Sequence, residues 1–214
     1  MDENLYKQWK DLYDEAFAYT RQLQVSNGIL IEVAAQHPLV DRKYPNTEFT
    51  KRLATAAEKY IIWTHQGYKV AIYVPGSKHV HNGVEDAISL SEAGTKYLLD
   101  YGINKDDIYG DAENDKYTCG HGVYCTEDEC FVATQLFKDI GFGKLVSICS
   151  PAQLMRKQFA YIKCGIIAEM HSAPCKYMFH NYVDEYFKEI PAFLENDVDH
   201  FNTIRNARKP THHQ

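Results

Sequence analysis

Apolar runs alternate with amphipathic segments along most of this chain. The runs are rich in Val, Ile, Leu and Ala, as is typical of strands buried on both faces. We predict strands at residues 29–35, 68–74, 107–109, 144–149 and 166–170. The segments between them carry apolar residues three and four positions apart, which predicts helices at residues 47–65, 84–101, 126–140 and 150–165. Because right-handed crossovers make successive strands parallel, this alternation predicts a doubly wound α/β fold, a mainly parallel sheet with helices on both faces.

Further helices are predicted at both ends of the chain. Leu5, Trp9, Leu12, Ala16, Tyr19 and Leu23 form a stripe at helical spacing, so we expect an N-terminal helix within residues 1–24 that packs against the sheet. Helices are also expected at 182–190 and 193–205, within a C-terminal region 182–206, and 209–214 is expected to be a frayed tail. A chain of 214 residues fits one hydrophobic core, so we expect one Rossmann-like domain over 1–214 with its core at about 27–171.

Composition and charge limit the possible partners. Hydrophobic residues make up 45% of the chain, which is enough for a packed core. The net charge is −6 and no basic stripe is present, so we expect no nucleic acid partner. A small anionic ligand is compatible with that charge, because a few backbone N–H groups and one arginine can hold it.

The N-terminal residues and the cysteines predict a location. Residues 1–24 are rich in charge and lack the apolar stretch of a signal peptide or of a membrane span of about 20 residues. The six cysteines show no compact disulfide framework, which favours reduced thiols. We therefore expect a cytoplasmic protein without a membrane partner.

Polar residues follow four of the predicted strands. In an open parallel sheet, ligands bind beyond the carboxyl ends of the strands, where the loops diverge. Loops are commonly polar, so the set of exits is more informative than any single one. The four exits are Gln36-His37, the segment 76–79, Ser150, and His171-Ser172. The sequence therefore predicts one ligand-binding cleft at this edge of the sheet.

Several residues near these exits are suited to bind an anion. Gly76 would let the backbone approach a ligand closely, and the Ser77 hydroxyl would add a donor. Arg156 lies one turn and a half into the helix after Ser150, so its guanidinium could reach back to an anion there. Arg52, early in the helix after the first strand, is a similar candidate, although both arginines could simply be solvated. The longer glycine pattern of a nucleotide fingerprint is missing.

Candidates for proton transfer lie in the same loops. Thr126 and Glu129 match a capping box, and a capped helix N-terminus is also a place where an anion binds. Each of His37, His79 and His171 follows a predicted strand, and an imidazole there could act as a general base or be a solvated loop residue.

The segment 110–124 is polar and contains three glycines, so we predict a surface loop that could act as a lid. Cys119, His121, Cys125 and Cys130 cluster in and after it, but their spacing lacks the close pairs of a zinc site. The three histidines at strand exits also lack a metal-binding spacing, and we predict no metal.

The order of these features resembles the SanA/ElyC/YdcF family of Rossmann-like proteins, over about residues 27–171. The first strand ends in small residues at 33–36, Arg52 follows on a helix, and the second strand ends in the turn 74–77. Later, the segment 126–129, Ser150 and Arg156 are similar to the family pattern. Two features differ: Ala34-Ala35-Gln36 replaces a glycine-rich strand end, and Gln153 replaces a histidine.

The resemblance implies an anion-binding or nucleotide-type pocket at the strand ends, with no agreed reaction. Family members are often tethered to the bacterial envelope, and we do not expect that role here. We predict an enzyme, a transferase or hydrolase, that acts on a nucleotide-like or phosphorylated small molecule. Glu129 and His79 would transfer protons, and the ligand-binding residues would be Gln36, Arg52, Gly76, Ser77, Thr126, Ser150, Arg156 and His171.

Two other functions are compatible with the same residues. A noncatalytic protein could sequester a nucleotide or an S-adenosylmethionine-type ligand in this cleft, and these two molecules are also the candidate cofactors. An interaction protein or oligomer could use the 16 tyrosines and 10 phenylalanines as a partner surface, although aromatic residues also fill cores.

Overall fold

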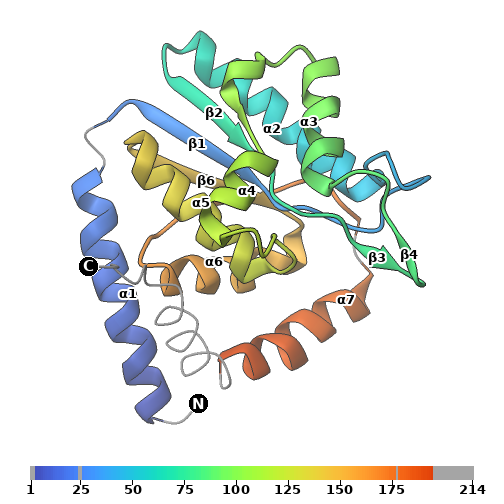
Figure 1. Ribbon diagram of the computed structural model, residues 1–214. Coiled ribbons are helices and arrows are strands. Elements are labelled where there is room, and N and C mark those ends of the chain that lie inside the picture. The colour runs from blue at the N-terminus through green and yellow to red at the C-terminus, as the bar shows by residue number, and fades with distance from the viewer. Residues whose placement is uncertain (1–2, 24–25, 177, 195–214) are drawn as a thin grey trace, which may run out of the picture.

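A computed structural model describes residues 3–23, 26–176 and 178–194. Its centre is a five-stranded sheet in the order β5-β2-β1-β6-β7, in which every pair of neighbours is parallel (Figure 1). The strands are β1 Gly28–Val33, β2 Lys69–Tyr73, β5 Ile108–Tyr109, β6 Lys144–Cys149 and β7 Glu169–Ser172. The predicted Rossmann-like α/β fold is therefore confirmed.

The strand order reverses between β1 and β6. From β1 the chain proceeds outward through β2 to β5, then returns to pair β6 with the other side of β1. Ile31 of β1 pairs with Ile72 on one side and with Val146 on the other. At such a reversal the loops leave in opposite directions, which opens a crevice at the carboxyl ends of the two central strands.

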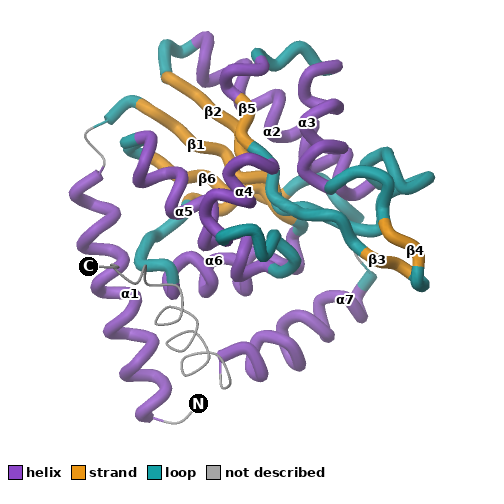
Figure 2. Tube along the Cα trace, in the orientation of Figure 1, coloured by secondary structure: helices purple, strands orange, loops and turns teal. Residues whose placement is uncertain are grey.

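Helices cover both faces of the sheet (Figure 1). The α-helices are α1 Glu3–Leu23, α2 Thr47–His65, α3 Leu90–Asp100, α4 Asp111–Thr118, α5 Thr126–Ile140, α6 Leu154–Lys163 and α7 Phe179–Val183. Two 3-10 helices, η1 Lys105–Asp107 and η2 Pro151–Gln153, and the π-helical segment η3 Asp184–Glu189 complete the set. The antiparallel hairpin β3 Val80–His81 and β4 Val84–Glu85 projects away from the sheet (Figure 2).

Side chains of β1 alternate between two hydrophobic clusters. Ile29, Ile31 and Val33 pack with residues of α2 and α3 on one face, whereas Leu30 packs with residues of α5 and α6 on the other. Because successive side chains of a strand point to opposite faces, Glu32 is directed to the same face as Leu30. The Glu32 carboxylate therefore lies on the face of the sheet that α5 and α6 cover.

Three predicted elements have the same bounds in the structure. The helices at 47–65 and 126–140 and the strand at 144–149 have the expected bounds. Asn46 caps α2 by accepting a hydrogen bond from the Phe49 N–H at 2.9 Å. The capping box predicted for α5 is wrong, because Cys125 precedes the helix without a side-chain cap and Thr126 is its first residue.

Two segments differ from the prediction. The helix predicted at 84–101 begins only at Leu90, because Ser89 caps it with a bond from the Glu92 N–H at 2.8 Å and residues 84–85 form β4. The loop predicted at 110–124 contains α4, which has few apolar residues and therefore gave no helical pattern. After α4, Gly122 and Val123 are buried, whereas residues 119–121 and Tyr124 are exposed.

The last strand begins three residues later than predicted. Ile166 is buried but precedes β7, in which Glu169, His171 and Ser172 are polar and none of the four residues is fully buried. An edge strand pairs on one side only and is less covered than a central strand, so its faces accept polar residues and the apolar run did not mark the paired ones. His171 therefore lies inside a strand and does not follow one.

The terminal helices pack on α6. Trp9 of α1 contacts Phe159 edge to face, with ring centroids 5.2 Å apart, and joins a cluster with Ile162, Ile190 and Leu194. Most of α1 therefore packs on α6, whereas its last residue, Leu23, packs against the cluster that contains Leu30 and Leu145 of the sheet. Residues 179–194 form one helical stretch, whereas most of the helix predicted at 193–205 and the tail 209–214 lie outside the described residues. No helix among the described residues is both long and apolar enough to cross a membrane.

Candidate functional site

A cleft of about 300 Å³ lies at the carboxyl ends of β1, β2 and β6, where the strand order reverses. Its volume is at the lower end of the range for small-molecule sites. The end of β1, the exit of β2 and the starts of α5 and α6 all contribute side chains. They include Gln36, His37, Gly76, His79, Tyr124, Thr126, Glu127, Glu129, Gln153, Arg156, Lys157 and Phe193.

A buried ionic triad forms the floor of this cleft. The Lys157 ammonium lies 2.8 Å from Oε2 of Glu129 and also pairs with Glu32. The second Glu129 oxygen accepts a hydrogen bond from the Ala35 N–H at 3.1 Å. Lys157 is only 1% exposed and Glu32 is fully buried, whereas Glu129 is at the surface of the cleft. The backbone of β1 and the lysine of α6 thus fix the orientation of the Glu129 carboxylate.

Within the triad, Glu32 also accepts hydrogen bonds from two hydroxyl groups. Ser147 of β6 and Tyr161 of α6 both donate to its Oε2, the latter at 3.0 Å. Together with Lys157, these donors satisfy the carboxylate inside the core, as a buried charge requires.

Burial changes the protonation of Glu129. Desolvation is the largest cause and raises the pKa of its carboxyl, and the nearby negative charge of Glu32 raises it too. Lys157 lowers the pKa but does not offset these two effects, so it remains raised. For Lys157, burial alone would lower the pKa, and the carboxylates of Glu129 and Glu32 more than offset this, so its pKa is raised. The lysine therefore stays charged, while Glu129 takes up a proton more readily than an ordinary glutamate.

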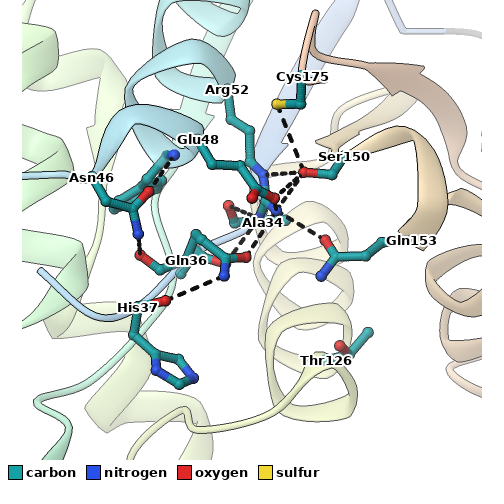
Figure 3. A network of polar contacts seen from close by, with 12 residues as sticks. Ala34, Gln36, His37, Asn46, Glu48, Arg52, Thr126, Ser150, Gln153 and Cys175 are labelled. Atoms are coloured by element: carbon teal, nitrogen blue, oxygen red, sulfur yellow. Dashed lines mark hydrogen bonds and ion pairs between the residues drawn. The ribbon is translucent and has the colours of Figure 1, made fainter. Parts of the chain in front are cut away.

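Arg52 joins the loops behind the cleft (Figure 3). This fully buried side chain donates from Nη1 to the carbonyls of Ala34 and Ala35, both at 2.9 Å. Its remaining bonds go to the side chains of Gln36, Glu48, Ser150 and Gln153. Because protein acceptors use the whole guanidinium, Arg52 positions the ends of β1 and β6 and does not face the cleft.

Six of the ten predicted site residues line the cleft: Gln36, Gly76, His79, Thr126, Glu129 and Arg156. Ser150 is fully buried against Arg52. Ser77 anchors the loop after α4, since its Oγ accepts from the Val123 N–H at 2.8 Å. His171 is not brought to the cleft, because it lies in β7 with its Nε2 2.6 Å from Glu169 Oε1 and its ring near Trp63.

Arg156 lines the cleft but is paired with the C-terminal helical stretch. Its Nε lies 3.0 Å from Glu185 Oε1, and its Nη1 lies 2.5 Å from Glu189 Oε2. Nη2 also reaches Thr126 Oγ1 at 3.5 Å. Burial and then the neighbouring Glu189 raise the pKa of Glu185 to about 7, although Arg156 lowers it.

Aromatic and imidazole rings form one wall. The rings of His37 and His79 stack with centroids 4.5 Å apart, and Tyr124 meets His79 edge to face at 5.5 Å. Burial, followed by the charge of His37, lowers the pKa of His79, and Asp86 opposes this. His79 is therefore neutral at pH 7 and able to accept a proton.

Sequence reasoning missed Lys157, Glu32 and Tyr124. A signal existed for Glu32, the only charged residue in the apolar run 29–35. A lone carboxylate in a strand buried on both faces needs a partner, so a buried cation was to be expected. No local pattern pointed to Lys157 as that cation.

Comparisons with protein-family models, with curated proteins and with solved structures found no match. Within the described part of the chain, no group of three or more His, Cys, Asp or Glu side chains is placed to hold a metal ion. The site is therefore interpreted from its own geometry.

Proposed function

We propose that this protein is an enzyme, a transferase or hydrolase, that acts on a nucleotide-like or phosphorylated small molecule in the cleft. The observation that supports this most is the Glu129 carboxylate, which is buried, oriented by two donors and still in contact with the cleft. Buried carboxylates with a raised pKa are typical of groups that exchange protons during catalysis.

Glu129 and His79 take the proton-transfer roles in this proposal. Glu129 holds or releases a proton at its exposed edge, while Lys157 and the Ala35 N–H keep it in one orientation. His79, neutral at pH 7, also lines the cleft and serves as a second acceptor. Gly76 and Thr126 contact the ligand from the exit of β2 and the start of α5.

We further propose that the chain is a divergent relative of the SanA/ElyC/YdcF family that acts in the cytoplasm. The order of Arg52, Gly76, Ser150 and Arg156 along the fold supports the relationship, and Gln153 marks the divergence. The six cysteines are all free thiols, which suits a reducing compartment.

A ligand panel tests this function. We expect some member of a set of nucleotides, sugar phosphates and S-adenosylmethionine to raise the melting temperature, because a ligand that binds the folded state stabilises it. With that ligand, Glu129→Gln should retain binding and lose turnover by about 100-fold or more. Asp139→Asn is the control and should retain turnover, because Asp139 pairs with Lys116 at the far end of α5, away from the cleft. The absence of any thermal shift, or full turnover by Glu129→Gln, would contradict the proposal.

The second candidate function is a binding protein that holds the same ligand unchanged. It is favoured by the pairing of Lys157 and Arg156 with protein carboxylates, which limits the charge that they can supply during a reaction. Recovery of chemically unchanged ligand after prolonged incubation with the wild-type protein would select this function over catalysis.

A further inference from the structure

Both cations at the cleft are already neutralised. Among the described residues that line it, the arginine and lysine are Arg156 and Lys157. Two carboxylates contact each of them: Glu185 and Glu189 contact Arg156, whereas Glu32 and Glu129 contact Lys157. The cleft and the groups directly behind it therefore carry more negative than positive charge.

The other usual sources of positive potential are weakened too. The first turn of α5 contains Glu127, Asp128 and Glu129, whose carboxylates lie where the helix dipole would otherwise attract an anion. The pKa of His79 is lowered by its burial and by His37, so its imidazole adds no charge at pH 7. A chain of phosphates would enter this cleft without matching counter-charges, and desolvating such a ligand would be costly.

The same walls suit hydroxyl groups and a ring. Glu129 offers a fixed carboxylate acceptor, and Thr126 adds a hydroxyl from the start of α5. Gln153 bonds Arg52 through Oε1, and its amide nitrogen points away from Arg52, toward the side where Thr126 lies (Figure 3). Tyr124 and the stacked imidazoles of His37 and His79 form a wall against which a ring can pack.

We propose that the ligand is a hydroxyl-bearing ring, the ribose of a nucleoside or a free sugar, that carries at most one phosphate. This inference rests on the proposed function and narrows its substrate class. Glu129 accepts hydrogen bonds from the ring hydroxyls, and Gln153 and Thr126 bind further ring oxygens. Polyphosphates are rejected by the carboxylates that surround Arg156 and Lys157.

Calorimetric titration of the full chain with two series tests the inference. One series is adenosine with its mono-, di- and triphosphate, and the other is glucose with its mono- and bisphosphate. We expect the unphosphorylated or monophosphorylated member of one series to bind best, and affinity to fall by about tenfold or more with each added phosphate. The series that binds identifies the ring.

A charge variant provides a second readout. Glu185→Gln combined with Glu189→Gln removes the two carboxylates that pair with Arg156. At pH 8, where Glu185 with its pKa of about 7 is mostly ionised in the wild-type protein, the double variant should therefore bind diphosphate and triphosphate about tenfold more tightly. Asp184→Asn is the control. Asp184 lies on the same helical stretch but pairs with Lys188 and not with Arg156, so its substitution should leave the affinity for the polyphosphates unchanged.

The outcomes separate the two proposals. If affinity rises with each phosphate in the wild-type protein, the charge inference is overturned and the proposed function stands. If no member of either series binds while another member of the wider ligand panel raises the melting temperature, the inference fails and the proposed function stands; if no member of the panel has an effect either, both are overturned. If the double variant binds the polyphosphates no better than the wild type, carboxylate repulsion at Arg156 is not the cause of selection, and the inference fails.

Discussion

Lys157 and Glu129 join the two helices that frame the cleft, through an ion pair of 2.8 Å between Nζ and Oε2. The same ammonium pairs with Glu32 in the central strand, so one buried cation serves two buried carboxylates. Such an arrangement adds little net stability compared with apolar packing. Removing one partner is nevertheless strongly destabilising, because the charges that remain are buried away from water without a counter-charge. A binding site can use it to keep one carboxylate fixed.

Lys157→Met should destabilise the protein by about 3 kcal/mol or more, because Glu32 and Glu129 would remain buried without a cation. Without Lys157, the folded-state pKa of Glu129, which burial already raises, rises further above that of the unfolded chain. Stability should then be retained at low pH and lost as the pH rises, so the defect should be larger at pH 8 than at pH 5. Urea unfolding at the two pH values measures this difference.

Lys188→Met is the matched control for this variant. The Lys188 side chain is 70% exposed in its pair with Asp184, and an exposed pair of this kind contributes little to stability. A Lys157→Met protein that loses no more stability than Lys188→Met would show that the triad is not a coupled unit.

Arg52→Lys should destabilise the protein although the charge is kept. Lysine cannot reproduce the fork that donates at once to the Ala34 and Ala35 carbonyls and to the Ser150 hydroxyl. Loss of two or more buried bonds predicts a decrease of about 2–4 kcal/mol in the free energy of unfolding. Arg42→Lys is the control, because Arg42 is exposed and donates from Nε to the Glu85 carbonyl. Equal effects of the two substitutions on denaturant unfolding would argue against a structural role for Arg52.

The fold was predictable because its signals are local. Apolar runs and helical spacing predicted β6 and α2 with correct bounds, and the helical segment predicted to start at Ser150 begins there as the 3-10 helix η2. The prediction failed for two elements that lack these local patterns. Strand β7 is an edge strand with polar residues, and α4 has no apolar face, so neither shows the periodicity that prediction relies on.

The place of the cleft was predictable, but the roles of its side chains were not. Topology alone brings strand exits together, which predicted Gln36, Gly76 and His79. Which cation each carboxylate meets depends on contacts between distant segments: Lys157 pairs with Glu32, 125 residues earlier in the chain. Likewise, no local pattern indicated that the Arg52 guanidinium would donate hydrogen bonds to the Ala34 and Ala35 carbonyls.

Glu185 should make stability fall as the pH rises through about 7. Its folded-state pKa is raised to about 7 by burial and by Glu189, above the ordinary value of an unfolded glutamate, so the folded state binds an extra proton between those two values. The stabilisation is complete below the unfolded pKa and is lost near pH 7. Glu185→Gln should therefore flatten the decrease in melting temperature between pH 5 and 8, by the equivalent of about 1–2 kcal/mol.

Glu92→Gln is the comparison for this pH effect. Glu92 is exposed on α3 and pairs with Lys96, so its removal leaves Glu185 and Arg156 untouched and the decrease should persist. If Glu185→Gln shows the same pH dependence as the wild-type protein, the raised pKa of Glu185 is refuted.

Gly76→Ala should be more destabilising than Gly102→Ala, although both glycines have a positive φ. Gly76 has φ +105°, and an added Cβ would lie 2.8 Å from Leu90 Cβ and 3.0 Å from Ala35 Cβ, atoms held by the backbone of α3 and by the residues after β1. Gly102, at φ +95°, has nothing within 4 Å of the added Cβ, so its substitution costs only the backbone strain of about 1–2 kcal/mol. Thermal unfolding should therefore show a larger decrease in melting temperature for Gly76→Ala, by several degrees for a chain of this size. Equal decreases would mean that the loop can move away from Leu90, so that the close packing at this wall of the cleft does not fix the β2 exit.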